Sequence, residues 1–133
     1  MAIIWNETQP AGNFDKYWYS CSISGDKMIA GVNGGRLYYY NGSSWSETQP
    51  AGDTNQNWRC CSISGDKMIA GVYNGRLYYY NGSSWSETQP AGNFDKNWRC
   101  CSISGDKMIA GVNGGRLYTG SSPRTINNFF LLF

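Results

Sequence analysis

Residues 57–80 read N-W-R-C-C-S-I-S-G-D-K-M-I-A-G-V-Y-N-G-R-L-Y-Y-Y, and this stretch decides the fold. Its β-branched and aromatic runs are separated by Gly65-Asp66 and Asn74-Gly75, which are typical of tight turns between antiparallel strands. Further along the chain, Asn81-Gly82-Ser83 predicts a third turn, and another strand-like run follows around Trp85. We therefore expect four short strands, at 57–64, 67–72, 76–80 and 84–88.

The same unit recurs every 40 residues, with equivalent tryptophans at Trp5, Trp45 and Trp85. The length of 133 residues is three such units and 13 residues more. As far as Tyr118, the last unit differs from the middle unit only at the equivalents of 53–56 and 73–74, which we interpret as loops. Four short strands and three tight turns in about 40 residues predict one blade of a β-propeller.

We predict an all-β fold of β-propeller blades, with three four-stranded repeats in residues 1–118 that start near 5, 45 and 85. Three blades are too few for a ring, since propellers typically have four to eight. Residues 2–8 repeat the sequence of an outer strand, so the chain begins with a strand that has no blade before it. The position 40 residues after Trp85 is Thr125, so the last blade has no equivalent outer strand.

These two ends are complementary, and we expect a second copy of the chain to complete the ring. Two chains joined head to tail give a six-bladed homodimer, in which each N-terminal strand completes the other chain's last blade. Such closure removes sheet edges that would otherwise aggregate. A nine-bladed trimer is the alternative and needs a wider channel.

The tail at 119–133 does not repeat and ends in the apolar run F-F-L-L-F. It is too short to span a membrane, which takes roughly 20 apolar residues. Either it packs on the ring or is disordered, or residues 127–133 supply the outer strand of the last blade. The second possibility would displace the N-terminal strand and weaken the case for a dimer.

The repeats resemble those of the BNR or Asp-box propellers, the sialidase-like superfamily that also includes photosystem II assembly factors and some glycoside hydrolases. The pattern S-x-D-x-G-x-x-W is matched at Gly42 and Trp45, and again at Gly82 and Trp85, while tyrosines occupy the Ser and Asp positions. The resemblance covers residues 2–118 and implies a propeller. In plan, the chain also resembles short-chain propeller lectins that assemble from several copies.

Composition removes several function classes. The chain has 11 Lys and Arg against 9 Asp and Glu, a net charge of +2, which is too small for a nucleic-acid or membrane-surface partner. It begins without a basic and apolar leader, and we expect a cytoplasmic protein. It has no histidine, the commonest general base and metal ligand, and we expect neither a metal nor a cofactor.

Five cysteines fall in register with the repeat. Cys60-Cys61 and Cys100-Cys101 are adjacent pairs, and Cys21 aligns with the second member of each pair. Neighbours on a strand point to opposite faces, and no C-x-x-C spacing is present, which disfavours a metal site. We interpret these residues as small buried thiols without disulfides.

Arg36, Arg76 and Arg116 recur before Leu-Tyr, and three arginines hold a carboxylate in sialidases. Here they occupy identical blade positions, too evenly spaced for one small anion, so we favour stacking on tyrosine or pairing with aspartate, at Asp26, Asp66 or Asp106. The glutamates at 7, 47 and 87 likewise share one environment, whereas glycoside hydrolysis needs two carboxylates in different environments. We therefore expect no enzyme.

Symmetry favours repeated weak binding instead. Aromatic rings beside planar hydrogen-bonding groups suit a sugar, and several equivalent shallow sites between blades gain by avidity. We predict a lectin-like module with glycans as partners. The alternative is a structural or protein-interaction scaffold, designed or virus-derived, in which the aromatics are inter-blade core and no small molecule binds. The candidate ligand-binding residues are Trp45, Trp85, Tyr40, Tyr80, Arg36, Arg76, Arg116, Glu47 and Glu87.

Overall fold

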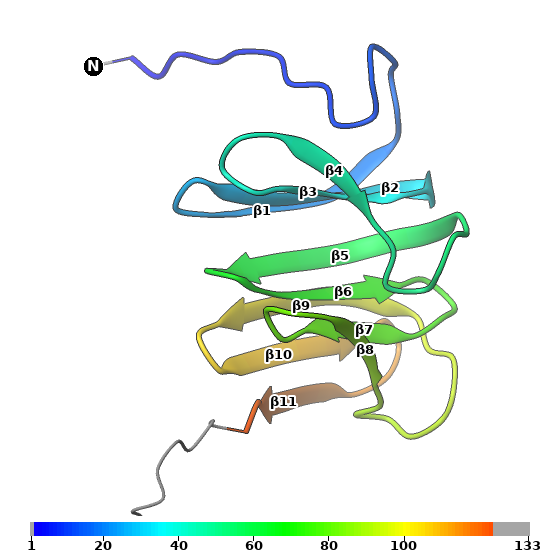
Figure 1. Ribbon diagram of the computed structural model, residues 1–133. Coiled ribbons are helices and arrows are strands. Elements are labelled where there is room, and N and C mark those ends of the chain that lie inside the picture. The colour runs from blue at the N-terminus through cyan, green and yellow to red at the C-terminus, as the bar shows by residue number, and fades with distance from the viewer. Residues whose placement is uncertain (1, 124–133) are drawn as a thin grey trace, which may run out of the picture.

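The computed structural model describes residues 2–123, and in this part of the chain eleven β-strands form three successive antiparallel meanders (Figure 1). The first meander consists of β1 (Trp18–Ser24), β2 (Lys27–Gly35), β3 (Leu37–Tyr40) and β4 (Trp45–Thr48). The second consists of β5 (Gln56–Ser64), β6 (Lys67–Val72), β7 (Leu77–Tyr80) and β8 (Trp85–Thr88). The third consists of β9 (Trp98–Ser104), β10 (Lys107–Val112) and β11 (Leu117–Ser121).

The four strands expected between 57 and 88 are confirmed, with bounds that differ by at most one residue. Local turn chemistry explains this agreement. Gly65 adopts φ of +61° between β5 and β6, and Asn74 adopts φ of 59° in the turn before β7. These turns set a register in which Ile63 pairs with Met68, and Met68 with Tyr80.

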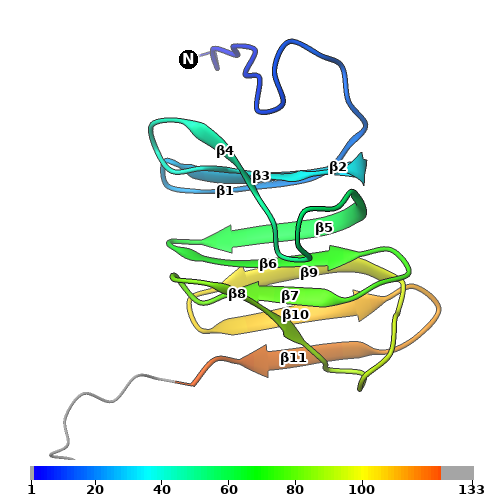
Figure 2. The ribbon, with the colours of Figure 1, turned by 45° about the vertical axis from the view of Figure 1, so that its right-hand side comes forward.

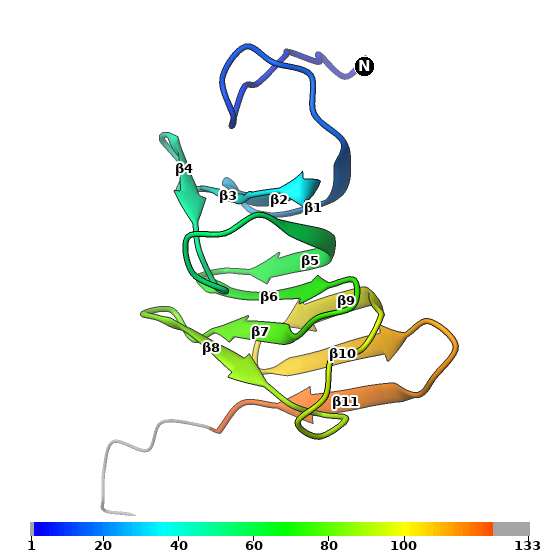
Figure 3. The same ribbon diagram turned by 90° about the vertical axis from the view of Figure 1, so that its right-hand side faces the viewer.

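The three meanders lie one above another (Figure 1), with β1, β5 and β9 toward one side of the stack and β4 and β8 toward the other (Figure 3). Short pairings tie neighbouring meanders together, between Asn33 of β2 and Asn57 of β5, and between Gly75 and Lys96. We call the strands β1, β5 and β9 the inner strands and the side of β4 and β8 the outer rim. The N-terminal segment and β11 lie at opposite ends of the stack (Figure 2).

The core lies between the meanders rather than within any one of them. Ile29 and Leu37 of the first meander pack with residues of the second, including Trp58 and Ile63. The second interface repeats the first, so that each meander buries one face against the next. The equivalent set there comprises Ile69, Leu77, Trp98 and Ile103, with Cys60 and Ala110.

Serine hydroxyls on the inner strands add hydrogen bonds across these interfaces. The Oγ of Ser22 accepts the backbone N–H of Ile63 at 3.2 Å, and the Oγ of Ser62 accepts that of Ile103 at 3.1 Å. The same spacing of 41 residues recurs because the interfaces are equivalent. A buried N–H without such an acceptor would cost about 1–3 kcal/mol.

The single chain bears on the predictions about the chain ends only at the C-terminal boundary of the last repeat. Residues 2–8, predicted to pair with the last blade of a second chain, form no strand in the single chain, where the open edge of β11 lies at the far end of the stack. Three strands are described in the third meander, and β11 continues to Ser121, beyond the boundary expected at Tyr118. Any fourth strand at 127–133 lies outside the described residues.

No α-helix occurs between residues 2 and 123. Within this range there is accordingly no helix long and apolar enough to cross a bilayer.

Candidate functional site

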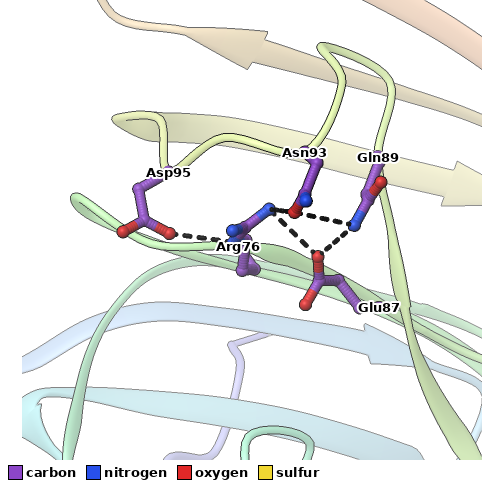
Figure 4. Close-up of polar contacts among 5 residues, drawn as sticks. All are labelled: Arg76, Glu87, Gln89, Asn93 and Asp95. Atoms are coloured by element: carbon purple, nitrogen blue, oxygen red, sulfur yellow. Dashed lines mark hydrogen bonds and ion pairs between the residues drawn. The ribbon is translucent and has the colours of Figure 1, made fainter.

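The outer rim carries a polar cluster around Arg76, which we call the Arg76 cluster (Figure 4). Arg76 directly precedes β7, and the pairing of Tyr78 with Glu87 brings the β8 carboxylate beside the guanidinium. Nη1 of Arg76 lies 3.2 Å from Glu87 Oε2 and donates to Asn93 Oδ1 at 2.9 Å, while Nε lies 2.9 Å from Asp95 Oδ1. The cluster therefore joins β7, β8 and the loop that leads to the third meander.

The first meander holds a matching cluster. Nη1 of Arg36 lies 3.2 Å from Glu47 Oε2 and 2.8 Å from Asp53 Oδ1, and Gln49 donates to the same Glu47 oxygen at 2.7 Å. Both arginines thus already have two carboxylates each. Exposed ion pairs of this kind contribute only about 0–1 kcal/mol each, so the clusters orient the loops more than they stabilise the fold.

The expected pairing of these arginines with Asp26 or Asp66 is wrong. The register of β3 with β4 and of β7 with β8 delivers a glutamate to each arginine, whereas Asp26 and Asp66 lie in the hairpin turns at the other ends of the strands. Burial, together with the nearby Glu47 carboxylate, raises the pKa of Tyr38 next to this cluster. Its equivalent Tyr78 has a raised pKa for the same reasons, with Glu87 as the carboxylate.

The predicted aromatic residues of the outer rim do meet. The rings of Tyr40 and Trp45 lie 5.3 Å apart, as do those of Tyr80 and Trp85. Each indole N–H is already engaged by the neighbouring repeat, because Trp85 Nε1 donates to Thr48 Oγ1 and Trp45 Nε1 donates to Thr8 Oγ1, both at 2.7 Å. These tryptophans are half-buried links between repeats rather than free platforms.

Arg116, the third arginine of the series, stands apart from the other candidates. It is exposed at the last meander, and no carboxylate among the described residues pairs with it. The residues that would complete a cluster around it occur instead in the N-terminal segment. There Gln9 donates to Glu7 at 2.6 Å and to Asn13 at 3.3 Å, as Gln89 does to Glu87 and Asn93.

The inner strands form a second candidate surface that the sequence analysis missed. They line a pocket of about 450 Å³ to which Tyr19, Arg59 and Arg99 contribute, together with cysteines, and no acidic residue lines it. These three residues are equivalent in the repeat, one on each inner strand. In the sequence, Tyr19, Arg59 and Arg99 each follow the equivalent tryptophan of their repeat. Only the packing of the meanders shows that these three positions share one face.

Arg59 is held between two aromatic rings on this face. Its Cζ lies 4.9 Å from the ring centroid of Tyr19 and 4.8 Å from that of Tyr73, within the range of cation–π attraction. Its Nε is buried and has no hydrogen-bond partner among the described residues. The next equivalent, Arg99, is exposed. This inner face therefore carries positive charge that no carboxylate of the described chain neutralises.

The cysteines depart in part from the expectation of burial. Cys60 and Cys61 are buried, as predicted, but Cys21 and Cys100 are exposed because they lie on the first and last inner strands, which no further meander covers. All five are free thiols. No group of three potential metal ligands occurs between residues 2 and 123.

No family model matches this sequence, and no curated protein matches it. Solved structures do resemble the fold. "YCF48 bound to D1 peptide" matches with a TM-score of 0.62 at 14% identity over 78% of this chain and 37% of that one. "YCF48 from Cyanidioschyzon merolae" matches with a TM-score of 0.61 at 12% identity over 79% and 34%. The computationally designed Ika4 protein gives a TM-score of 0.46 at 8% identity over 83% and 94%.

The chain spans only about a third of the length of the YCF48 chains. At these identities the likeness concerns the fold and not the activity. The three stacked meanders, the all-β content and the match to YCF48 agree, and we conclude that this chain has a β-propeller-like fold.

Proposed function

We propose that this chain is a protein-interaction propeller, without catalytic activity, that completes a six-bladed ring by joining head to tail with a second copy. The observation that carries this proposal is that the two end faces of the stack expose the residues that the internal interfaces bury. Ile63 and Ile103 are 4% and 6% exposed, whereas their equivalent Ile23 is 66% exposed. At the other end, Leu117 is 66% exposed, whereas its equivalent Leu77 is 2% exposed.

These exposed residues belong to complementary halves of one interface. Inside the chain, residues equivalent to Leu117 and Ile109 pack against residues equivalent to Trp18 and Ile23 of the next meander. Contact between the last meander of one chain and the first meander of another would therefore repeat an interface that already forms twice. Burial of a large apolar side chain contributes about 1.5–3 kcal/mol, so joining these faces is favourable.

The space above Gly111 at the last meander, which we call the glycine socket, supports the same assembly. A Cβ on Gly31 would lie 2.8 Å from Trp58 Cβ, and a Cβ on Gly71 would lie 2.8 Å from Trp98 Cβ, so the next meander's tryptophan needs a glycine there. Gly111 retains the glycine, but no tryptophan approaches it within one chain. Trp18, the only equivalent tryptophan left, is 39% exposed at the opposite end of the stack.

The polar clusters are divided between the ends in the same way. Residues 7–16 are identical in sequence to 87–96, which surround Arg76, and they already hold the corresponding hydrogen bonds. Arg116, at the far end of the stack, has no segment equivalent to 87–96 beside it, and therefore lacks the carboxylates that such a segment supplies. In a head-to-tail ring, the N-terminal segment of each chain would bring Glu7 and Asp15 to the other chain's Arg116. The same docking would pair residues 5–8 with β11 as a fourth strand.

The mass of the native protein in solution tests this assembly. Size-exclusion chromatography with light scattering should give twice 14.8 kDa, and a nine-bladed trimer would give three times that mass. Ile23→Ser should yield a monomer with an unchanged circular dichroism spectrum, because Ile23 is exposed in the single chain. Ile63→Ser, the matched control, should instead destabilise the fold. A wild-type chain that stays monomeric at its highest soluble concentration would contradict the ring.

The inner face is the surface that we propose for a protein partner. Its arginines are unneutralised, and two chains would line one channel with four of them, alongside the two copies of Tyr19. Such a surface suits an extended peptide segment that carries carboxylates, since charge-assisted hydrogen bonds to arginine contribute about 1.5–3 kcal/mol each. A propeller of similar fold, YCF48, has been solved with a peptide bound, which supports the capacity of the fold to bind peptides.

Fluorescence anisotropy with a labelled oligoglutamate peptide tests this surface, with a neutral peptide of equal length as comparison. The wild-type protein should bind the acidic peptide preferentially, and more weakly as salt is raised. Arg99→Gln should weaken binding by about tenfold or more, while Arg76→Gln, outside the pocket, should leave it unchanged. Equal binding of both peptides, or none, would remove the inner face from consideration.

Carbohydrate binding at the outer rim is the second candidate, favoured by the half-exposed pairing of Tyr80 with Trp85. It is the weaker one because Arg76 and Glu87, which a sugar would need, bind each other. Binding of the wild-type protein to a glycan array, lost in the Trp85→Ala variant, would make carbohydrate binding the better-supported function. We further propose a cytoplasmic location, which fits the free thiols.

A further inference from the structure

The inner strands bring a serine and a cysteine side chain of neighbouring meanders into direct contact. Ser20 Oγ lies 3.2 Å from Cys61 Sγ, across the interface of β1 with β5. One repeat further along, the equivalent positions at the interface of β5 with β9 are Cys60 and Cys101, which line the same pocket. The repeat relates these contacts, because Ser20 is equivalent to Cys60, and Cys61 to Cys101.

The third contact in this series needs a second chain. Cys100 is equivalent to Ser20 and Cys60, and the position that would face it is equivalent to Cys61 and Cys101, which is Cys21. Both Cys100 and Cys21 are exposed, at opposite ends of the inner face. We propose that Cys100 faces the partner's Cys21 at each junction of the ring, and that an added oxidant can join these two thiols in an inter-chain disulfide.

This inference rests on the proposed head-to-tail assembly but makes a separate claim about one atom pair. The reaction joins two thiols through an S–S bond and releases two protons and two electrons. An azo oxidant such as diamide takes up both and becomes a hydrazine, so the step is balanced. Bridged cysteines usually have Cα atoms about 4.4–6.8 Å apart, which side chains in hydrogen-bonding contact can satisfy after a rotamer change.

Burial determines how readily such a pair reacts. A hydrogen bond with Cys60 and burial both raise the pKa of the Cys101 thiol. The ring would cover Cys100 and the partner's Cys21, which are exposed in the single chain, as the internal interfaces cover Cys60 and Cys61. Since the thiolate is the reactive species, oxidation should be run at about pH 9, near the ordinary pKa of a thiol.

The experiment treats the native full-length protein with diamide and separates the products on a non-reducing gel. The wild type should give a covalent dimer that a reductant converts back to the monomer. Cys21→Ser and Cys100→Ser should each abolish this band, whereas Cys60→Ser and Cys101→Ser should retain it. Light scattering on every variant shows whether the non-covalent dimer persists.

A mixture of the two junction variants gives the sharpest control. A ring that contains one Cys21→Ser chain and one Cys100→Ser chain keeps one intact Cys100–Cys21 junction. Refolding the two variants together should therefore restore the cross-link that each lacks alone. A dimer by mass that gives no cross-link, or a cross-link that survives Cys21→Ser, would overturn the pairing while the ring stands. A monomeric mass would instead remove the ring itself.

Discussion

At the scale of single residues, the packing of one meander on the next determines the pKa of the Cys61 thiol. It lies on β5 between two meanders, is almost fully buried, and contacts Ser20 Oγ at 3.2 Å. Burial raises its pKa to about 12 from 9.0, more than the hydrogen bond with Ser20 lowers it. In the unfolded chain this thiol would ionise first, so folding holds a proton that the unfolded state has already lost.

This difference predicts a loss of stability in alkali. The contribution of Cys61 is fully present below pH 9 and disappears as pH rises toward 12, because ionisation there favours the unfolded chain. The free energy of unfolding should fall by up to about 1.4 kcal/mol per pH unit from this one group. Denaturant titrations between pH 8 and about 11 should show a shallower fall in Cys61→Ala than in the wild type. Parallel slopes for the two proteins would contradict the assignment.

At the scale of elements, the N-terminal segment is arranged like an outer strand, although it pairs with no other strand in the single chain. Its loop forms the same turn as the equivalent loop of the second meander. The backbone N–H of Gly12 donates to Gln9 O at 3.2 Å, as that of Gly92 donates to Gln89 O at 3.1 Å. The hydroxyl of Thr8 accepts a hydrogen bond from the indole N–H of Trp45, just as the hydroxyl of Thr48 accepts one from Trp85. The segment therefore occupies the position that the outer strand of a preceding meander would have.

Deletion of residues 2–8 should therefore expose the edge of β11. In the wild type we expect the partner's N-terminal segment to pair with β11 in the register of β7 with β8, where Leu77 faces Thr88 and Tyr79 faces Ser86. Hydrogen exchange at residues 117–121 should be faster in the deletion variant by about tenfold or more, since those amides lose their acceptors. Amides of β7 should be unaffected and serve as the internal control. Equal exchange of β11 in both proteins would argue against this pairing.

Sequence reasoning succeeded where the information is local. The turns at Gly65 and Asn74 fix β5, β6 and β7 through backbone conformations that few residues adopt, and those strands were predicted to within a residue. It failed where partners come from elsewhere in the chain. The partners of Arg36 follow from the register of β3 with β4, and the rings around Arg59 come from a neighbouring meander and a distant turn, neither of which composition or spacing reveals.

At the scale of the whole molecule, the stack is a repeating interface interrupted at both ends. Each internal interface places a tryptophan against a glycine, and Gly111 and Trp18 are the members left without their counterpart. Their different surroundings allow a substitution to distinguish an open stack from a closed ring.

Gly111→Ala is that substitution, and Gly71→Ala is its matched control. In the single chain, a Cβ on Gly111 would meet only Cys100 Sγ at 3.0 Å and Leu117 Cδ1 at 3.3 Å, whereas one on Gly71 would press on Trp98 Cβ at 2.8 Å. Gly71→Ala should therefore lower the free energy of unfolding by about 1–3 kcal/mol, as expected for overpacking. If the ring closes, Gly111→Ala should leave the fold of each chain intact but weaken dimerisation by about tenfold or more, because the new methyl group would strike the partner's Trp18. Sedimentation equilibrium of the two variants and the wild type measures this directly, and an unchanged dimer dissociation constant for Gly111→Ala would mean that Trp18 never reaches the socket.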